Sequence, residues 1–124
     1  MTADTENGYW DMNSFLKQFV GPWYESLQNP QKAQEQLLVD LLKKYASTDY
    51  GTDHNAGKIF TITDYQKNFP ITNYQGYEPY FVKVKEGNYR ALLSEAPECW
   101  VMTRGSTGKS KVLPATQSHL DQIY

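Results

Sequence analysis

This 124-residue chain carries a polar loop between two short apolar runs near its C-terminal end. Residues 99–103, before the loop, are rich in types that favour strands, and residues 111–113 after it are again extended in character. A helix directly after the loop is disfavoured, because Pro114 in its first turns would remove a hydrogen bond and cost about 3 kcal/mol. The pattern predicts two strands joined as a hairpin, with Pro114 ending the second strand.

The loop combines three kinds of residue that suit a polyphosphate. Its glycines let the backbone approach a ligand closely, and successive backbone N–H groups in such turns form a concave nest for an anion. Its hydroxyl side chains add hydrogen-bond donors, and its lysines add positive charge. These residues are Gly105, Gly108, Ser106, Thr107, Lys109 and Lys111.

Two known types of phosphate loop compete for this segment. Residues 108–110 (Gly-Lys-Ser) fit the end of the Walker loop, which joins a strand to a helix. Thr103, however, stands where the first glycine of that loop belongs, and residues 112–114 (Val-Leu-Pro) do not suit the required helix. The Walker interpretation therefore fails on both counts.

The segment closely resembles the second type, the Ser/Thr/Gly-rich phosphate loop of adenylate-forming enzymes, which links two strands as a hairpin. In that pattern Ser or Thr, a small residue and Gly are followed by two Ser or Thr residues, Gly, any residue, Pro or Ser, and Lys. Arg104 departs from the pattern, because a small residue is usual at its position. The matching residues are Thr103, Gly105, Ser106, Thr107, Gly108, Ser110 and Lys111.

The resemblance continues on both sides of the loop. It is closest to the auxin-responsive acyl-acid amido synthetase family and its prokaryotic relatives, and residues 55–124 carry it. The first 50 residues add a helical N-terminus that is compatible with that family. The similar stretches are residues 69–74, 77–80, 84, 87, 92–93 and 111–116.

The resemblance implies the N-terminal segment of an acyl-adenylate-forming ligase, and so a fragment of a larger α/β adenylate-forming fold. Such an enzyme uses ATP and Mg²⁺ to activate a carboxylic acid as an acyl-adenylate, and then passes the acyl group to an amine or a thiol. No catalytic residue and no protein metal ligand is assignable here, and we expect this chain alone to be inactive. The residues implied to bind the ATP phosphates are Thr103, Gly105, Ser106, Thr107, Gly108 and Lys111, with Lys111 as a mobile cation.

The N-terminal part of the sequence predicts two amphipathic helices that are antiparallel neighbours. Apolar residues recur there at three- and four-residue steps, which is typical of a helix face that packs in a core. Gly21–Pro22 predicts a kink or break in the first helix, and Asn29 followed by Pro30 predicts the capped start of the second. The first stripe is Trp10, Phe15, Leu16, Phe19, Val20, Trp23, Tyr24 and Leu27, and the second is Ala33, Leu37, Leu38, Leu41, Leu42 and Tyr45.

The rest of the sequence predicts short elements. Residues 47–58 have the composition of a polar loop, and Thr63 is expected to cap a brief helical turn. Thr72 is expected to begin a helix that ends at Gly87, and Thr116 to cap a final helix. We therefore expect a mainly α chain with a short β-hairpin near the C-terminus. Its predicted parts are a helical pair (1–50), a loop and helices (51–98), and a strand, phosphate loop, strand and start of a helix (99–124).

Composition and charge argue against several classes of protein. Hydrophobic residues make up 40% of the chain and charged residues 21%, which is too apolar for a disordered tail. The net charge is −2 without a basic stripe for nucleic acid, and no apolar run approaches the roughly 20 residues of a membrane span. A single cysteine, Cys99, which we expect to be buried, indicates a reducing cytoplasm. His54 and His119 lack the spacing of metal ligands.

A function of a different class stays open at this point. The chain is then a small helical protein-interaction module with no catalytic activity, and its Gly-rich hairpin is only a turn. As a ligase segment, its expected partners are ATP and a carboxylic acid in the full-length protein, with no nucleic acid and no membrane. A lone hairpin is marginal in water, so we also expect the segment to self-associate.

Overall fold

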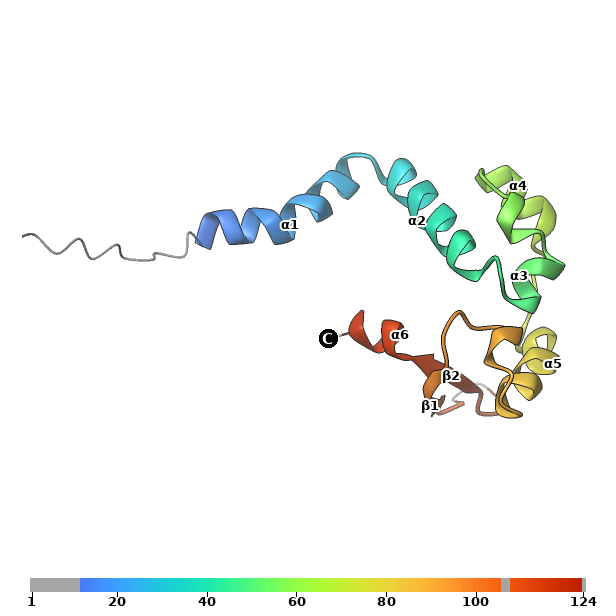
Figure 1. Cartoon of the computed structure of the whole chain (residues 1–124). Helices are drawn as coiled ribbons and strands as arrows, with labels where there is room; N and C mark the ends of the chain where they lie inside the picture. The colour runs from blue at the N-terminus through green and yellow to red at the C-terminus, as the bar shows by residue number, and fades with distance from the viewer. Residues whose placement is uncertain (1–11, 106–107, 124) are drawn as a thin grey trace, which may run out of the picture. The chain divides into compact units, whose positions relative to one another are not determined.

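The computed structural model describes residues 12–105 and 108–123, and it is mainly helical with one β-hairpin near the C-terminus, as the sequence predicts (Figure 1). The described chain divides into two compact units between Gln36 and Leu37. The helices are α1 (Met12–Gln28), α2 (Pro30–Tyr45), α3 (Asp49–Asp53), α4 (Ile62–Asn68), α5 (Tyr74–Lys85) and α6 (Gln117–Asp121), with short 3₁₀ turns η1 (Ala56–Lys58) and η2 (Tyr89–Ala91). The strands are β1 (Pro97–Met102) and β2 (Val112–Thr116).

Helix α1 is amphipathic in sequence, but the structure buries none of its residues. Within the unit that contains α1, its apolar stripe is therefore not covered, and Trp10, the first residue of that stripe, lies outside the described residues. The helix also continues through Pro22, where the Ser26 hydroxyl donates to the Pro22 carbonyl oxygen at 2.8 Å. Of the predicted kink or break, the break therefore does not occur. The exposed large apolar side chains of α1 are Met12, Phe15, Leu16, Phe19, Trp23, Tyr24 and Leu27.

Helix α2 begins as the sequence predicts. The Asn29 side chain accepts a hydrogen bond from the Lys32 N–H at 3.2 Å, and Pro30 occupies the first helical position, where its missing N–H has no partner to lose. Of this helix only Leu42 is buried. Leu37 and Leu41, from the predicted stripe, are exposed.

The predicted polar loop over residues 47–58 is instead a short helix, α3, followed by η1. Thr48 caps the start of α3. Its hydroxyl accepts a hydrogen bond from the Gly51 N–H at 2.9 Å and donates one to the Tyr45 carbonyl oxygen at 2.7 Å. The cap is almost fully buried, with Thr48 only 2% exposed. Gly51 is required there, since a Cβ would collide with the Tyr45 carbonyl oxygen.

Two other helix starts are shifted from their predicted positions. Helix α4 is capped by Thr61 rather than Thr63, and α5 is capped by Asn73, whose side chain accepts from the Gly76 N–H at 3.2 Å, rather than by Thr72. Gly87 ends the α5 region as predicted, with a φ of 100° that few other residues adopt.

Two small apolar clusters make up the core of the second unit. One gathers buried residues from α2, η1 and the start of the following turn, and the other joins α5 and η2 to the hairpin through Trp100. The T-shaped contact between Phe81 and Trp100, with ring centroids 6.4 Å apart, fixes α5 against β1. The buried members are Leu42, Ala56 and Ile59 in the first cluster and Val84, Ala91 and Leu93 in the second.

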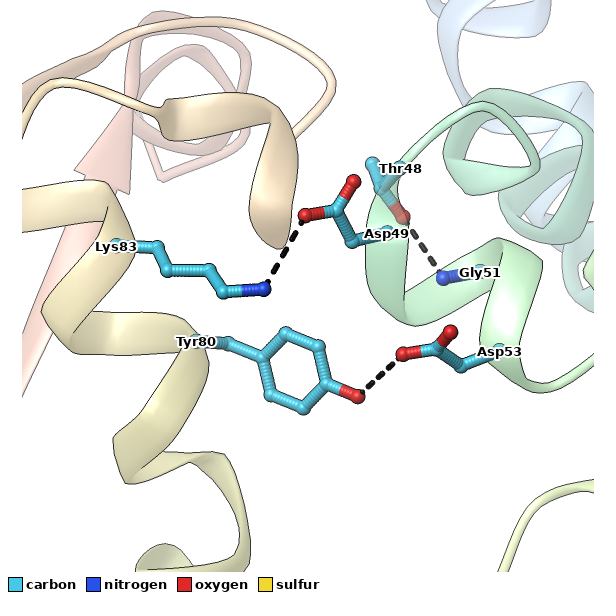
Figure 2. A network of polar contacts seen from close by, with 6 residues as sticks. All are labelled: Thr48, Asp49, Gly51, Asp53, Tyr80 and Lys83. Atoms are coloured by element: carbon cyan, nitrogen blue, oxygen red, sulfur yellow. Dashed lines mark hydrogen bonds and ion pairs between the residues drawn. The ribbon is translucent and has the colours of Figure 1, made fainter.

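Polar contacts tie α3 to α5 (Figure 2). The Tyr80 hydroxyl donates to Asp53 Oδ2 at 2.8 Å, and Lys83 Nζ lies 3.5 Å from Asp49 Oδ2. Tyr50 of α3 also packs edge-on against Tyr80, with ring centroids 5.0 Å apart. Burial and the bond to Asp53 raise the pKa of Tyr80. These contacts hold α5 in place, and the first residues of α5 face the predicted phosphate loop.

The two strands pair antiparallel, from Met102 with Val112 to Pro97 with Thr116. Pro114 lies inside β2, opposite Trp100, so the prediction that it ends the strand is wrong. Both strands of a two-stranded sheet are edges, and a proline is tolerated on an edge because a missing donor there breaks no second ladder. Cys99, which we expected to be buried, is exposed on β1.

Candidate functional site

The stem of the predicted phosphate loop is closed by a pair of hydrogen bonds. The Thr103 N–H donates to the Lys111 carbonyl oxygen at 2.9 Å, and the Lys111 N–H donates to the Thr103 hydroxyl at 2.9 Å. The Thr103 hydroxyl thus accepts the hydrogen bond that its backbone carbonyl oxygen would accept in a regular antiparallel ladder. The loop therefore begins at Thr103, one residue after β1, and ends at Lys111, one residue before β2.

The two loop glycines have different physical roles. Gly105 has a φ of 64°, and a Cβ there would lie 2.6 Å from the Gly108 carbonyl oxygen and 2.8 Å from the Ser110 nitrogen. Gly108 donates its N–H to the Gly105 carbonyl oxygen at 3.3 Å, and a Cβ on Gly108 would meet no atom of the described residues within 4 Å. Gly105 is required by the conformation of the turn. Gly108 has no such constraint, and its lack of a side chain leaves the backbone there accessible.

A hollow of about 680 Å³ lies between this loop and the start of α5. Its described walls include three exposed cations, Arg104, Lys109 and Lys111, and one carboxylate, Glu78. Ser106 and Thr107, also predicted to bind phosphate, lie outside the described residues. Thr103, Gly105, Gly108 and Lys111 all line the hollow, so the structure brings these predicted residues together.

The opposite wall was not predicted from the sequence as part of the site. Asn73, Tyr74, Gln75 and Glu78, from the cap and first turns of α5, line the hollow about 30 residues before the loop in the chain. A signal was present, because these residues lie in or beside the stretches that resemble the amido synthetase family.

Tyr74 joins the two walls directly. Its hydroxyl donates to the Val112 carbonyl oxygen at 3.0 Å and accepts from the Val112 N–H at 3.2 Å. Val112 is the first residue of β2, immediately after the loop. The start of α5 and the exit of the loop are therefore held together.

The end of β2 is fixed by a second polar contact. Glu95 Oε1 accepts from the Ser118 N–H at 2.9 Å, at the start of α6. Hydrogen bonds from Ser118, and a further one from Thr116, lower the pKa of Glu95 to about 2. The Thr116 side chain also caps α6, as predicted, by accepting from the His119 N–H at 3.4 Å.

Binding of an anion is the chemistry that this arrangement best supports, since donors and cations face one hollow. Among the described residues no group of three His, Cys, Asp or Glu side chains is placed to hold a metal ion. The helices in the described part of the chain include none with the length and apolar character to cross a membrane.

Comparison with known proteins identifies a family. Residues 22–124 match the family described as the GH3 family N-terminal domain. The chain is 23% identical over 100 residues to indole-3-acetic acid-amido synthetase GH3.2 of Arabidopsis thaliana, a match that covers 79% of this chain and 18% of that protein. It is 25% identical over 100 residues to indole-3-acetic acid-amido synthetase GH3.8 of Oryza sativa subsp. indica, covering 79% of this chain and 16% of that protein. No solved structure matches the chain significantly. The chain thus spans less than a fifth of the length of these relatives.

Proposed function

The chain belongs to the GH3 family, and we propose that it is the N-terminal part of an ATP-dependent ligase that adenylates a carboxylic acid and transfers the acyl group to an amine or a thiol. The observation that carries this proposal is the cation-lined hollow at the loop that resembles the adenylate-forming motif. The names of the relatives, amido synthetases, support the same class of reaction. The proposed ATP-binding residues are Thr103, Gly105, Ser106, Thr107, Gly108 and Lys111.

The size and charge of the hollow suit the phosphates of ATP. At about 680 Å³ it falls within the roughly 300–1,000 Å³ of typical ligand pockets. In the proposal, loop backbone N–H groups and the Thr103 side chain position the phosphates, and Lys111 moves with the charge as it develops. Arg104 and Lys109 add positive potential at the rim, where exposure weakens each single charge.

The proposed reaction has two steps. A carboxylate oxygen of the acid forms a bond to the α-phosphorus of ATP, and the bond from that phosphorus to the bridging oxygen breaks, so that pyrophosphate leaves with the electron pair. An amine or thiol then attacks the acyl carbonyl carbon, AMP leaves, and the nucleophile loses a proton. The contribution proposed for this chain is to hold the leaving phosphates in line and to offset their charge.

The described residues suit a Mg²⁺ ion that arrives on the nucleotide. Glu78 is the one carboxylate among the described residues of the hollow, too few for an all-protein site. Mg²⁺ usually keeps several waters and binds through substrate phosphates with one or two carboxylates. Bound in this way, the ion would neutralise charge on the triphosphate, and Glu78 is the side chain available to approach it.

The experiment is ATP-dependent pyrophosphate release, measured on the protein read to its natural stop codon with a panel of carboxylic acids. We expect release that requires an acid, and its loss in the double variant Gly108→Ala, Lys111→Ala. Lys67→Ala is the matched control, because Lys67 lies on α4 and not among the residues that line the hollow. The 124-residue chain alone is expected to release none.

Absence of release with every acid tested contradicts the proposal. It would favour the alternative, a helical protein-interaction module without catalytic activity. Release that survives in the double variant would keep the ligase but remove the loop from its mechanism.

A further inference from the structure

The contact between Tyr74 and Val112 joins residues that are 38 positions apart in the chain. Tyr74 is the first residue of α5, and its ring packs against that of the buried Phe81 with centroids 5.4 Å apart. Both partners are half-buried, so water competes less for their hydrogen bonds than at an open surface. The phenol is thus held by the core on one side and by the strand on the other.

The hydroxyl occupies the outer edge of β2. Successive residues of an antiparallel strand direct their N–H and C=O groups to opposite sides. Lys111 uses its backbone groups toward Thr103 on the partner side, and Val112 presents its own to Tyr74 on the other. One phenol, which both donates and accepts, therefore satisfies both backbone groups of the first β2 residue, in place of a neighbouring strand.

These two bonds also tie the start of α5 to the strand that leaves the loop. Tyr74 lies on the wall formed by the start of α5, and Val112 follows directly from the wall formed by the loop. Among the described residues, the hydrogen bonds that join the two walls are both made by this hydroxyl. The bond from Tyr80 to Asp53 leads instead to α3, and the ring contact of Phe81 with Trp100 holds α5 against β1 rather than against the loop exit.

We propose that Tyr74 is a positioning residue for the phosphate loop: its hydroxyl locks the loop exit to the start of α5 and so keeps the hollow at the width that a polyphosphate requires. This inference rests on the proposed function, because it concerns how the same site binds phosphates. Tyr74 acts through Val112 and the loop. Loss of the hydroxyl frees the exit strand, and ligand binding must then order it again.

The test is Tyr74→Phe in the protein read to its natural stop codon, with Tyr80→Phe as the matched control. Both changes remove one tyrosine hydroxyl from α5, but the second breaks a bond to Asp53 instead of to β2. Binding of inorganic tripolyphosphate and of ATP is measured by calorimetry, and exchange of the Val112 amide hydrogen by mass spectrometry. We expect Tyr74→Phe to weaken both ligands about tenfold and Tyr80→Phe to leave both within about twofold.

Amide exchange tests the inference in the unsubstituted protein as well as in the variant. In the unsubstituted protein the Val112 amide should exchange slowly although it faces an outer edge, and in Tyr74→Phe it should exchange at least about tenfold faster. Where pyrophosphate release is measurable, the KM for ATP should rise in Tyr74→Phe more than kcat falls.

Each contrary outcome has a distinct meaning. Unchanged tripolyphosphate affinity in Tyr74→Phe overturns this inference and leaves the proposed function intact. Equal weakening in both variants overturns it as well, because general stability is then the cause. Fast exchange of the Val112 amide in the unsubstituted protein overturns it without any substitution. Failure of the unsubstituted protein to bind either ligand overturns the proposed function, and this inference with it.

Discussion

At the scale of single residues, Gly105 decides the shape of the loop. Its φ of 64° is open to glycine at little cost, and a Cβ at this point would press on the Gly108 carbonyl oxygen and the Ser110 nitrogen. Gly108 has neither constraint among the described residues, where a Cβ would meet no atom within 4 Å. The two glycines of one motif thus differ: Gly105 fixes the backbone turn, and Gly108 is the one that we propose lets a ligand approach.

Gly105→Ala is therefore expected to weaken tripolyphosphate binding about tenfold or more. A left-handed conformation costs a non-glycine residue about 1–2 kcal/mol, and the new methyl group adds a steric clash. The matched control is Gly87→Ala, which imposes a φ of 100° on alanine at the end of α5 with no atom within 4 Å. It should lower the free energy of unfolding and leave tripolyphosphate affinity unchanged. Equal affinity of both variants, measured by calorimetry, would refute this role of Gly105.

At the scale of elements, short helices are held by caps and by a few contacts between them. Helix α5 depends on α3 through Tyr80 and Asp53, and on β2 through Tyr74 and Val112. Helices of five residues, such as α3 and α6, are too short to be stable by themselves. Their side-chain caps and tertiary partners therefore decide whether they form.

Tyr80→Phe is expected to lower the free energy of unfolding by about 0.5–1.5 kcal/mol, because it removes a hydrogen bond to a carboxylate. Lys83→Met should change that free energy by less than about 1 kcal/mol, since both side chains of its ion pair are about half exposed, at 50% and 47%. Chemical denaturation of both variants measures the difference. A larger loss for Lys83→Met than for Tyr80→Phe would contradict this assignment of the α3–α5 contact.

The contact between Glu95 and α6 should depend on pH. Its pKa is lowered from an ordinary value of 4.5 to about 2, so the charged carboxylate contributes fully above pH 4.5 and its contribution is lost as the pH falls toward 2. We expect the NMR shift of the Ser118 amide to titrate with its midpoint near pH 2, the folded-state pKa of Glu95. In Glu95→Gln the transition should be absent. A Ser118 transition near pH 4.5 in the unsubstituted protein would show that the contact does not perturb the carboxyl group.

Local signals in the sequence predicted local features of the structure. The cap at Asn29, the glycine end of α5 at Gly87, the cap at Thr116 and the hairpin all follow from residue chemistry within a few positions. Helix α3 was missed because turn-forming residues there also suit a helix start once Thr48 is buried. The α5 wall of the site was missed for another reason: the bond from Tyr74 to Val112 depends on tertiary packing, which residue patterns do not specify.

At the scale of the whole molecule, apolar surface remains exposed in both units. In α1 Phe19 is 73% exposed and Trp23 57%, and in the hairpin Met102 is 68% exposed. The hairpin also has two outer edges, partly satisfied at Val112 by Tyr74. Contiguous exposed apolar residues and unpaired edges are typical of surfaces that pack against further protein.

We therefore predict that the 124-residue chain self-associates. Its mean mass by light scattering should rise with concentration, and Phe19→Lys and Met102→Lys should each reduce the rise by placing a charge in the apolar contact. Lys17→Gln, also on α1, is the control for a general change of charge. A constant monomer mass over a wide concentration range would contradict this prediction.

We propose that the hollow between the loop and α5 binds the phosphates of ATP. The most direct measurement is amide exchange by mass spectrometry on the protein read to its natural stop codon, with and without ATP and Mg²⁺. We predict slower exchange in the peptide that covers residues 103–112 on addition of ATP, and no such change in Lys111→Ala. ATP binding that leaves this peptide unchanged and slows exchange elsewhere would contradict the claim.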